Sequence, residues 1–490
     1  MVIGAGVGGL TAAARLAHAG FSVTVLEKNS RVGGRLDREE RNGYVWDTGP
    51  TLLLMPDVYR EFFRSLGRDL HDFLELRKLS PNYRVRFGDS TTLDMTTDLS
   101  ALMAGVEAIE PGAGAGLLRF LADAAVKYRV GRQRFVERNF VHAREFFSPR
   151  NLVDLLRTGA IDNYWRYTGR FFRDDRLRQA FSFQTIYLGI SPYHAPAVYA
   201  LLPYTELVEE GLWFPSGGMY VLAEALQRCA ELEGVEVRTG VTVSEICVRG
   251  ERVWGVETDQ GDVPADVVLA NADLPYVYRY LLPASARDLP AARVERLDYT
   301  CSAYMLYIGA RRRWPHLLHH NFFLSGDYAG TLGDIFARRM LPRDPAFYVC
   351  AASESEPHYA PPGGTSLMVL VPVPAQSPAV RWECEGEAFR ARILNLLETR
   401  AGLTGLRDAI DVLWERTPAD WRTVYNLHRG AAFGLAHGLF QVGWFRPDNR
   451  SRLLPNLYFV GASTRPGTGV PLVMIGARLV AERIMLEQCA

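Results

Sequence analysis

The chain has 490 residues, of which 48% are hydrophobic, and its 55 basic residues balance 55 acidic ones. This length predicts two or three domains with substantial cores, and the neutral balance predicts no nucleic-acid partner. The six cysteines include no Cys-x-x-Cys pair, so we expect reduced packing residues of a cytoplasmic chain, with no disulfide framework and no metal site. The sequence contains no run of 18 apolar residues, so we expect no membrane-spanning helix.

The first residues predict a βαβ unit that binds a dinucleotide. A buried strand ends at Val2 and Ile3, and an apolar helix and a second strand, Ser22 to Leu26, follow a glycine-rich turn. The glycines of this turn are Gly4, Gly6, Gly8 and Gly9. Such glycines allow a tight turn, close backbone approach to a pyrophosphate and packing of the helix on the strand. Glu27 ends the second strand and is expected to accept a hydrogen bond from a ribose hydroxyl.

The start of the chain is short for a strand. Only three residues precede Gly4, whereas strands usually run about 5–6 residues, so we expect a trimmed start or a misassigned initiator. The glycines, the missing basic segment and the Glu27 strand argue against a signal peptide.

Two further turns follow the βαβ unit. The first carries a glycine pair with flanking cations, Arg31 to Arg35, and the second follows a strand predicted from Tyr44 and contains Gly49, Pro50 and Thr51. A helix from Val58 to Leu66 comes next, and two alternating strands around residues 83–95 then predict that the chain leaves the cofactor domain.

The stretch from Lys127 to Arg150 mixes cations with large aromatic residues. It holds seven basic and two acidic residues, a net charge of +5, together with Phe135, Phe140 and Phe147. This pattern suits a surface that lies on an anionic bilayer. The alternative is a helical core of aromatics with a solvated basic face.

The second half of the chain contains further segments that are predicted to belong to the cofactor domain. Short strands between residues 235 and 270 predict a second pass through that domain, and the strand at residues 456–460 leads into a glycine-rich turn and a helix from Val470 to Ile484. Three histidines, His316, His319 and His320, lie beside Pro315 without a carboxylate or cysteine set, so we expect them on the solvated surface.

Four blocks of sequence resemble the carotenoid desaturase family of FAD-dependent oxidoreductases, in its bacterial-type phytoene desaturase branch. They are Val2 to Arg35, Gly211 to Met219, Gln441 to Pro447 and Asn456 to Pro471. The last block distinguishes this family best, although many relatives carry histidine where Arg465 stands and glycine near Ser463. That difference affects the assignment to a subfamily and leaves the assignment of the cofactor unchanged.

The resemblance implies an α/β fold in three parts. A Rossmann-like FAD-binding domain is expected at residues 1–85, 211–290 and 425–490. A discontinuous α+β substrate-binding domain is expected at residues 86–125 and 291–424, and a helical, membrane-associating region at 126–210.

The resemblance also implies FAD contacts beyond the first glycines and Glu27. Near the diphosphate, the flavin and the adenine these are Gly33, Gly34, Arg35, Gly49, Pro50, Thr51, Val243 and Asn271. For the second turn, a plain Gly-Pro turn is the alternative. At the last helix they are Gly461, Ala462, Val470 and Pro471, where the helix N-terminus can stabilise negative charge on a reduced flavin.

The implied reaction is FAD-dependent desaturation of a linear carotenoid precursor, by hydride transfer to the flavin. The expected partners are a hydrophobic polyisoprenoid, a membrane surface on which the cytoplasmic protein lies peripherally, and oxygen or a quinone as electron acceptor. Arg465 and Glu206 are the candidates for an acid or base. The alternatives are a carotene cis/trans isomerase, a desaturase of hydroxylated or C30 carotenoids, and a lipid-escort protein with a structural FAD.

Overall fold

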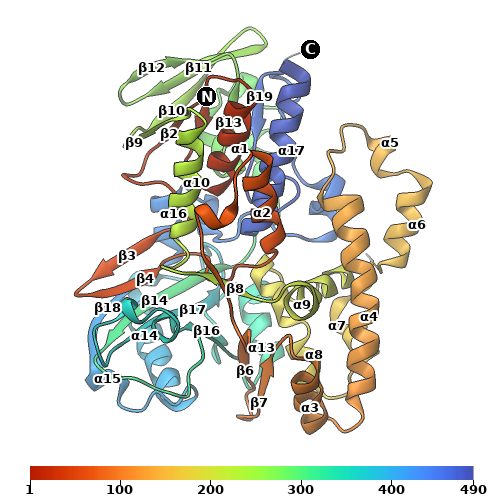
Figure 1. Cartoon of the computed structure of the whole chain (residues 1–490), viewed down its shortest axis with the longest axis vertical. Coiled ribbons are helices and arrows are strands. Elements are labelled where there is room, and N and C mark those ends of the chain that lie inside the picture. Colours follow the sequence, from red (N-terminus) through yellow and green to blue (C-terminus); the bar gives the residue numbers. More distant parts are fainter. Residues whose placement is uncertain (160, 489–490) are drawn as a thin grey trace.

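The computed structural model describes residues 1–159 and 161–488. A five-stranded parallel sheet lies at one end of the molecule, in the order β19-β13-β1-β2-β9 (Figure 1). Its strands are β1 (Val2–Ile3), β2 (Thr24–Glu27), β9 (Glu236–Thr239), β13 (Val268–Ala270) and β19 (Leu457–Phe459). The N-terminal, middle and C-terminal parts of the chain therefore meet in one sheet, as the sequence predicts.

Three helices cover this parallel sheet. Helix α1 (Val7–His18) follows β1 and packs against α10 (Val221–Leu232) and α17 (Val470–Gln488). The alanine-rich side of α1 is fully buried, which explains its close approach to both neighbours. Beside the sheet, β10 (Val243–Arg249), β11 (Arg252–Thr258) and β12 (Gly261–Pro264) form an antiparallel meander. Among the short strands expected between residues 235 and 270, the sequence pattern also favours one over residues 241–243. That strand is wrong, because only Val243 is paired, as the first residue of β10.

A seven-stranded sheet forms the other end of the molecule, in the order β18-β14-β17-β16-β15-β6-β7. Its strands are β6 (Tyr83–Arg86), β7 (Thr92–Met95), β14 (Ser302–Ala310), β15 (His320–Phe323), β16 (Phe347–Cys350), β17 (Thr365–Val373) and β18 (Ile410–Arg416). Pro372 lies inside β17, although a proline commonly ends a strand. It pairs with Ala303 on one side, while β16 reaches only Leu370 on the other, so its missing N–H breaks no ladder.

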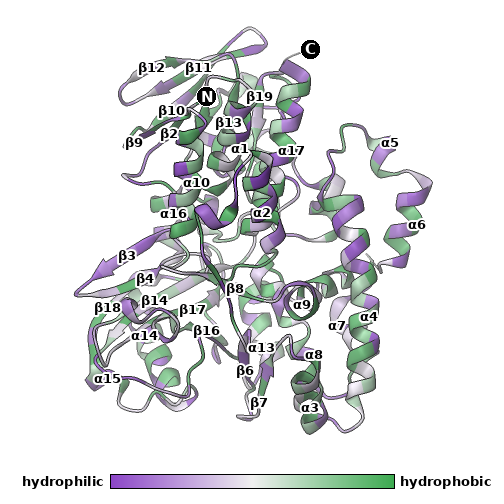
Figure 2. Cartoon of the chain, in the orientation of Figure 1, coloured by the Kyte–Doolittle hydropathy of each residue, from purple (hydrophilic) through white to green (hydrophobic). Residues whose placement is uncertain are grey.

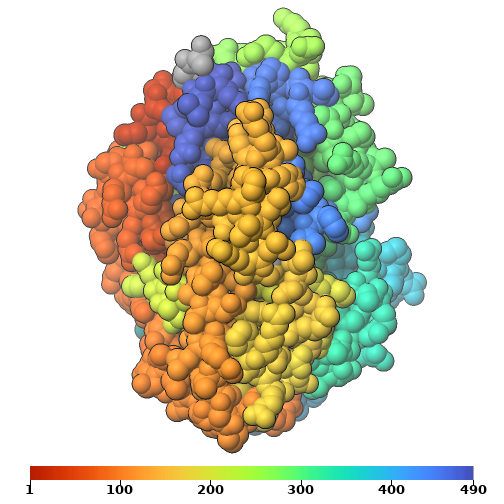
Figure 3. Space-filling view, turned by 90° about the vertical axis from the view of Figure 1, so that its right-hand side faces the viewer, coloured from red at the N-terminus to blue at the C-terminus, as the bar shows by residue number. Residues whose placement is uncertain are grey.

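Helices between the two sheets form one side of the molecule. They include α3 (Leu99–Ile109), α4 (Ala113–Gly131), α5 (Ala143–Phe146), α6 (Pro149–Arg157), α7 (Tyr164–Thr168), α8 (Asp175–Ala180) and α9 (Leu201–Tyr204). Figure 3 shows this orange and yellow segment covering the face, against the blue C-terminal part. The division into three domains stays a prediction. Strand β6, which straddles the expected boundary at residue 85, lies in the seven-stranded sheet.

Candidate functional site

A large pocket with a volume of about 520 Å³ connects the parallel sheet with the seven-stranded sheet. Sixteen of the seventeen residues predicted to bind FAD line it. They are Gly4, Gly6, Gly8, Glu27, Gly33, Gly34, Arg35, Gly49, Pro50, Thr51, Val243, Asn271, Gly461, Ala462, Val470 and Pro471. The seventeenth, Gly9, lies behind them, where a Cβ atom would stand 2.2 Å from the Gly4 carbonyl oxygen.

Asn271 joins the glycine turns from different parts of the chain. Its Nδ2 donates to the Gly4 carbonyl at 3.0 Å, and its backbone N–H donates to Ile3 at 2.8 Å. A Cβ atom added at Gly6 or Gly8 would lie 3.0 or 2.7 Å from the Asn271 amide. The glycines thus leave room for this side chain as well as for a cofactor.

Glu27 is buried at the pocket and faces backbone amides. Its two carboxylate oxygens accept from the N–H groups of Ala5 at 2.8 Å and Asn29 at 2.9 Å. Burial raises the pKa of Glu27 above its ordinary value, and these hydrogen bonds partly oppose the shift. Each oxygen keeps a second lone pair, so the carboxylate can still accept from a ribose hydroxyl.

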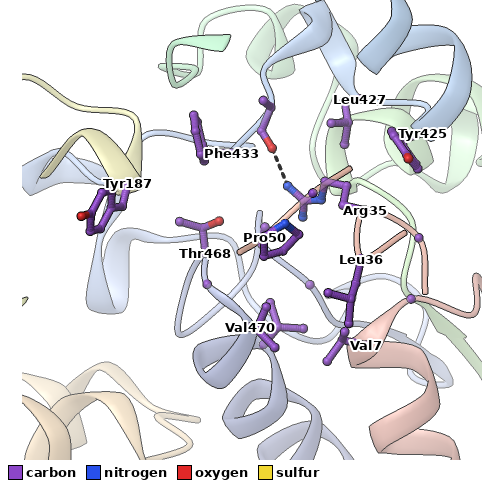
Figure 4. Close-up of a pocket in the computed structure, with 18 of the residues that line it drawn as sticks. Val7, Arg35, Leu36, Pro50, Tyr187, Tyr425, Leu427, Phe433, Thr468 and Val470 are labelled. Carbon is purple, nitrogen blue, oxygen red and sulfur yellow. Dashed lines mark hydrogen bonds between the residues drawn. The ribbon is translucent and has the colours of Figure 1, made fainter. Parts of the chain in front are cut away.

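The second glycine turn touches the first. Gly6 and Gly33 form a bridge, and a Cβ atom on Gly34 would stand 3.3 Å from the Gly6 Cα. Arg35 reaches the middle of the pocket, where its guanidinium donates to the Ala432 carbonyl at 2.6 Å (Figure 4). Burial lowers the pKa of Arg35 from its ordinary value, but the side chain remains a cation.

Two buried residues that the sequence analysis did not single out hold the C-terminal turn. Arg446 donates to five backbone carbonyls, including those of Ala462 and Thr464, and its pKa is lowered by burial to about 10. His437 accepts from the Thr468 N–H at 3.1 Å through Nε2. Arg446 falls inside one of the four blocks of the resemblance, whereas nothing in the sequence around His437 marks it.

Arg465 is not where the resemblance led us to expect it. It does not line the pocket, and its guanidinium donates to the carbonyls of Phe140 at 3.0 Å and Trp444 at 2.9 Å. The cation also lies 4.8 Å from the Trp444 ring centre. Arg465 therefore joins the helical side of the molecule to the C-terminal turn, and its guanidinium faces backbone carbonyls outside the pocket.

Glu206 lies behind the pocket wall. It is buried next to Thr205, which lines the pocket, and its carboxylate accepts from the Tyr83 hydroxyl at 2.6 Å. Desolvation raises the pKa of Glu206 to about 8, although hydrogen bonds from Tyr83 and Gln184 lower it. The group is therefore mostly protonated at neutral pH and lies one residue away from the pocket.

The three histidines have different surroundings. His316 is exposed, as expected. His319 and His320 are buried, so the expected solvated surface is wrong for both. The reason is strand pairing, because β15 begins at His320 in the interior of the seven-stranded sheet, between β16 and β6.

The residues at the parallel sheet fit FAD. The glycine turns and the N-termini of α1 and α17 leave room for a diphosphate, and the buried acceptor Glu27 can pair with a ribose hydroxyl. Apolar side chains line the rest of the pocket, as a dry redox site needs. Fold and site thus define a flavin-dependent oxidoreductase.

Comparison with known proteins identifies the family. Residues 7–485 match the flavin containing amine oxidoreductases. A zeta-carotene-forming phytoene desaturase of Myxococcus xanthus is 48% identical, with 99% of this chain and 93% of the relative covered. A 4,4'-diapophytoene desaturase (4,4'-diaponeurosporene-forming) of Staphylococcus haemolyticus is 37% identical, with 99% and 98% covered. A solved putrescine oxidase shares the fold, with a TM-score of 0.64 at 17% identity and 99% and 98% covered.

The chain therefore belongs to the flavin containing amine oxidoreductase family, and its relatives include phytoene and diapophytoene desaturases. The expected FAD-dependent oxidoreductase and the expected carotenoid desaturase resemblance are both confirmed.

The raised pKa of Glu206 predicts a pH-dependent stability effect. Between the ordinary glutamate pKa of 4.5 and pH 8, the folded state keeps a proton that the unfolded state loses, so the free energy of unfolding falls as pH rises. Glu206→Gln mimics the protonated acid. We expect parent and variant to be similar at pH 5, and the variant to be more stable by up to about 4 kcal/mol at pH 8.5, in urea unfolding.

The matched control is Glu209→Gln, on the exposed side of the same helical turn. Its free energy of unfolding should differ from that of the parent by the same small amount at both pH values. A Glu206→Gln effect of equal size at pH 5 and pH 8.5 would contradict a buried, protonated acid.

Proposed function

We propose that this chain desaturates a linear carotenoid precursor with FAD as the cofactor. The observation that carries the proposal is that one pocket contains both the dinucleotide cradle and an apolar chamber. The names of the phytoene and diapophytoene desaturases at 48% and 37% identity support a long isoprenoid as the occupant of the chamber. FAD, when bound, accepts the hydride that leaves an allylic carbon.

FAD-binding residues divide by position along the pocket. We place the diphosphate at the first two glycine turns, the ribose at Glu27, the adenine at Val243, and the flavin between Gly49–Thr51 and the start of α17. Gly49 is required for packing as well, because a Cβ atom there would stand 1.7 Å from the Arg35 carbonyl oxygen. These roles rest on the lining of the pocket and on the fit of the residues.

The apolar chamber extends away from the cradle. Figure 4 shows Tyr187 at the opposite end of the view from Tyr425 and Leu427, with Arg35 and Thr468 between them. Its wall combines the helical side of the molecule with the seven-stranded sheet. Lining residues include Phe183, Ile186, Tyr187, Leu201, Leu202, Met305, Phe322, Tyr348, Met368 and Phe433. Such side chains hold a polyene extended and exclude water, and positioning then supplies most of the catalysis.

The first test of the proposal is the reaction. Purified protein with phytoene or diapophytoene in liposomes should form products with longer conjugated systems, followed by long-wavelength absorbance, with oxygen or a quinone as electron acceptor. Under anaerobic conditions the substrate should bleach the flavin absorbance. Conversion of cis to trans carotenes by prereduced protein, with no longer chromophore, would replace the desaturase with an isomerase. Polyene binding without bleaching would indicate an escort protein.

The second test concerns FAD. Glu27→Arg places a cation where the carboxylate accepts hydrogen bonds from two backbone N–H groups and, we propose, from a ribose hydroxyl. FAD content of the purified variant should fall at least about tenfold, the equivalent of 1.4 kcal/mol. Glu27→Gln keeps one acceptor oxygen and should retain an intermediate amount. Glu40→Arg, on an exposed strand, is the control for charge reversal. Equal flavin absorbance in all variants would contradict this placement.

We propose that membrane association depends less on the net charge of the 127–150 stretch than expected. The structure pairs three cations of the 127–150 stretch with carboxylates: Lys127 with Asp123, Arg132 with Asp57 and Arg134 with Asp154. Lys127 is also buried. These pairs reduce the positive charge available to a bilayer. Phe140 and Phe146 are buried, as expected if the aromatic residues of this stretch form a helical core.

An exposed apolar patch lies nearby. Its aromatic part joins two segments, since Phe445 lies 6.0 Å from Phe147 and 6.1 Å from Phe440 between ring centres. Helix α6 adds exposed residues beside it, at the edge of the molecule in Figure 1, and Figure 2 shows polar and apolar turns side by side on this helix. The apolar patch consists of Phe147, Leu152, Val153, Leu156, Phe440 and Phe445. Arg144, Arg150 and Arg157 are exposed around it.

We propose that the apolar patch inserts into the interface of an anionic bilayer, with the three exposed arginines on phosphates. A contiguous group of exposed apolar side chains on a protein surface marks an interaction site. In the part of the chain that the structure describes, no helix has the length and hydrophobicity to span a bilayer.

Replacing Phe440 and Phe445 by serine should weaken binding to anionic liposomes at least about tenfold, because burying a phenylalanine contributes roughly 1.5–3 kcal/mol. Cosedimentation measures the bound fraction. The control replaces Leu232 and Leu486, which are 53% and 75% exposed on other helices, by serine and should bind like the parent. Equal loss in both double variants would contradict docking through the patch.

A further inference from the structure

Two histidines and one cysteine meet inside the seven-stranded sheet, outside the residues proposed for FAD. His320 at the start of β15 lies directly opposite Cys350 at the end of β16, and His319 precedes His320. Each of the three offers one ligand atom, and these atoms lie within 4.8 Å of one another. The three residues are between 0% and 6% exposed.

The hydrogen bonds of the two imidazoles resemble those of metal ligands. His319 Nδ1 pairs with the Ser355 hydroxyl at 2.9 Å, and His320 Nδ1 pairs with the Tyr348 hydroxyl at 2.7 Å. Both Nε2 atoms are buried and have no hydrogen-bond partner among the described residues. A buried polar atom without a hydrogen-bond partner destabilises the folded state by about 1–3 kcal/mol. A histidine that binds a metal through one ring nitrogen typically forms a hydrogen bond through the other, as Nδ1 does in both residues.

Size and protonation are also compatible with a bound ion. Metal bonds of roughly 2.0 Å to nitrogen and 2.3 Å to sulfur place ligand atoms at most about 4.3 Å apart, so small side-chain rotations close the cluster. A metal ion binds neutral imidazoles and a thiolate, so Cys350 must lose its thiol proton on binding.

Charge and ligand number select the metal. Two neutral imidazoles and one thiolate carry a charge of −1, which a monovalent ion neutralises in this buried place. Cu⁺ is soft and favours thiolate, whereas Zn²⁺ usually takes four ligands. Asp47 is the buried carboxylate that interacts with Cys350, but it accepts from the Tyr220 N–H and the Tyr359 hydroxyl, both at 3.1 Å, and does not belong to the ligand set.

We propose that His319, His320 and Cys350 bind one Cu⁺ ion, with the thiol proton released to solvent as the copper–sulfur bond forms. The bound ion would hold the His320 ring that contacts Tyr348. The Tyr348 hydroxyl also pairs with Thr51 at 2.8 Å, and both residues line the pocket. The site therefore connects to the pocket wall through one side chain. It does not depend on the proposed substrate.

The test is anaerobic titration of the FAD-loaded protein with Cu⁺ against a colorimetric Cu⁺ chelator. Exposed Cys384 is replaced by serine throughout, so that it does not compete. We expect one equivalent to be withheld from the chelator, and at least a tenfold loss of affinity in Cys350→Ser and in His320→Gln. Cys301→Ser removes another buried thiol and should bind copper like the parent.

X-ray absorption of the copper-loaded parent needs no variant to fold, and should show one sulfur and two nitrogen neighbours. No copper withheld by the parent, unchanged affinity in Cys350→Ser, or copper surrounded by nitrogen and oxygen alone would each overturn the proposal. So would one equivalent of Zn²⁺ bound in preference to Cu⁺.

Discussion

The position of one amide side chain, that of Asn271, constrains the whole cofactor end of the molecule. Its Nδ2 donates to the Gly4 carbonyl, a Cβ atom at Gly6 would lie 3.0 Å from that nitrogen, and a Cβ atom at Gly8 would lie 2.7 Å from the Oδ1. A Cβ atom at Gly461 would also lie within 3.8 Å of it. Three strands that are distant in sequence can end at the same point only because these turns lack side chains. The pocket is the space that this convergence leaves open.

Two cations stabilise the turns through backbone carbonyls. Arg446 donates to five backbone carbonyls and Arg35 to one, and burial lowers the pKa of each. The carboxylate of Asp273, which also lines the pocket, interacts with both cations. The hydrogen bonds to the carbonyls fix the turns around the pocket.

The sequence predicts what local rules determine. Spacing alone located the glycine turns, Glu27 and the strands around them, because a βαβ unit is a local motif. The errors involve contacts between distant residues. Arg132 and Arg134 pair with Asp57 and Asp154, which lie outside the 127–150 stretch. The net charge counted within that stretch therefore overestimates the charge that it exposes. His319 and His320 become buried only once β15 pairs with β16 and β6, and Arg465 turns to carbonyls at residues 140 and 444.

The same long-range packing keeps Glu206 out of the chamber. Glu206 is held behind the wall by Tyr83, and its raised pKa keeps it protonated at neutral pH, so it adds no carboxylate charge to the wall beside Thr205. A charged group in that wall would bind water and oppose entry of an apolar chain. Removal of a hydride next to an existing double bond needs position more than proton transfer, since the allylic system spreads the developing positive charge. An apolar chamber beside a rigid cradle meets that requirement with the residues this chain provides.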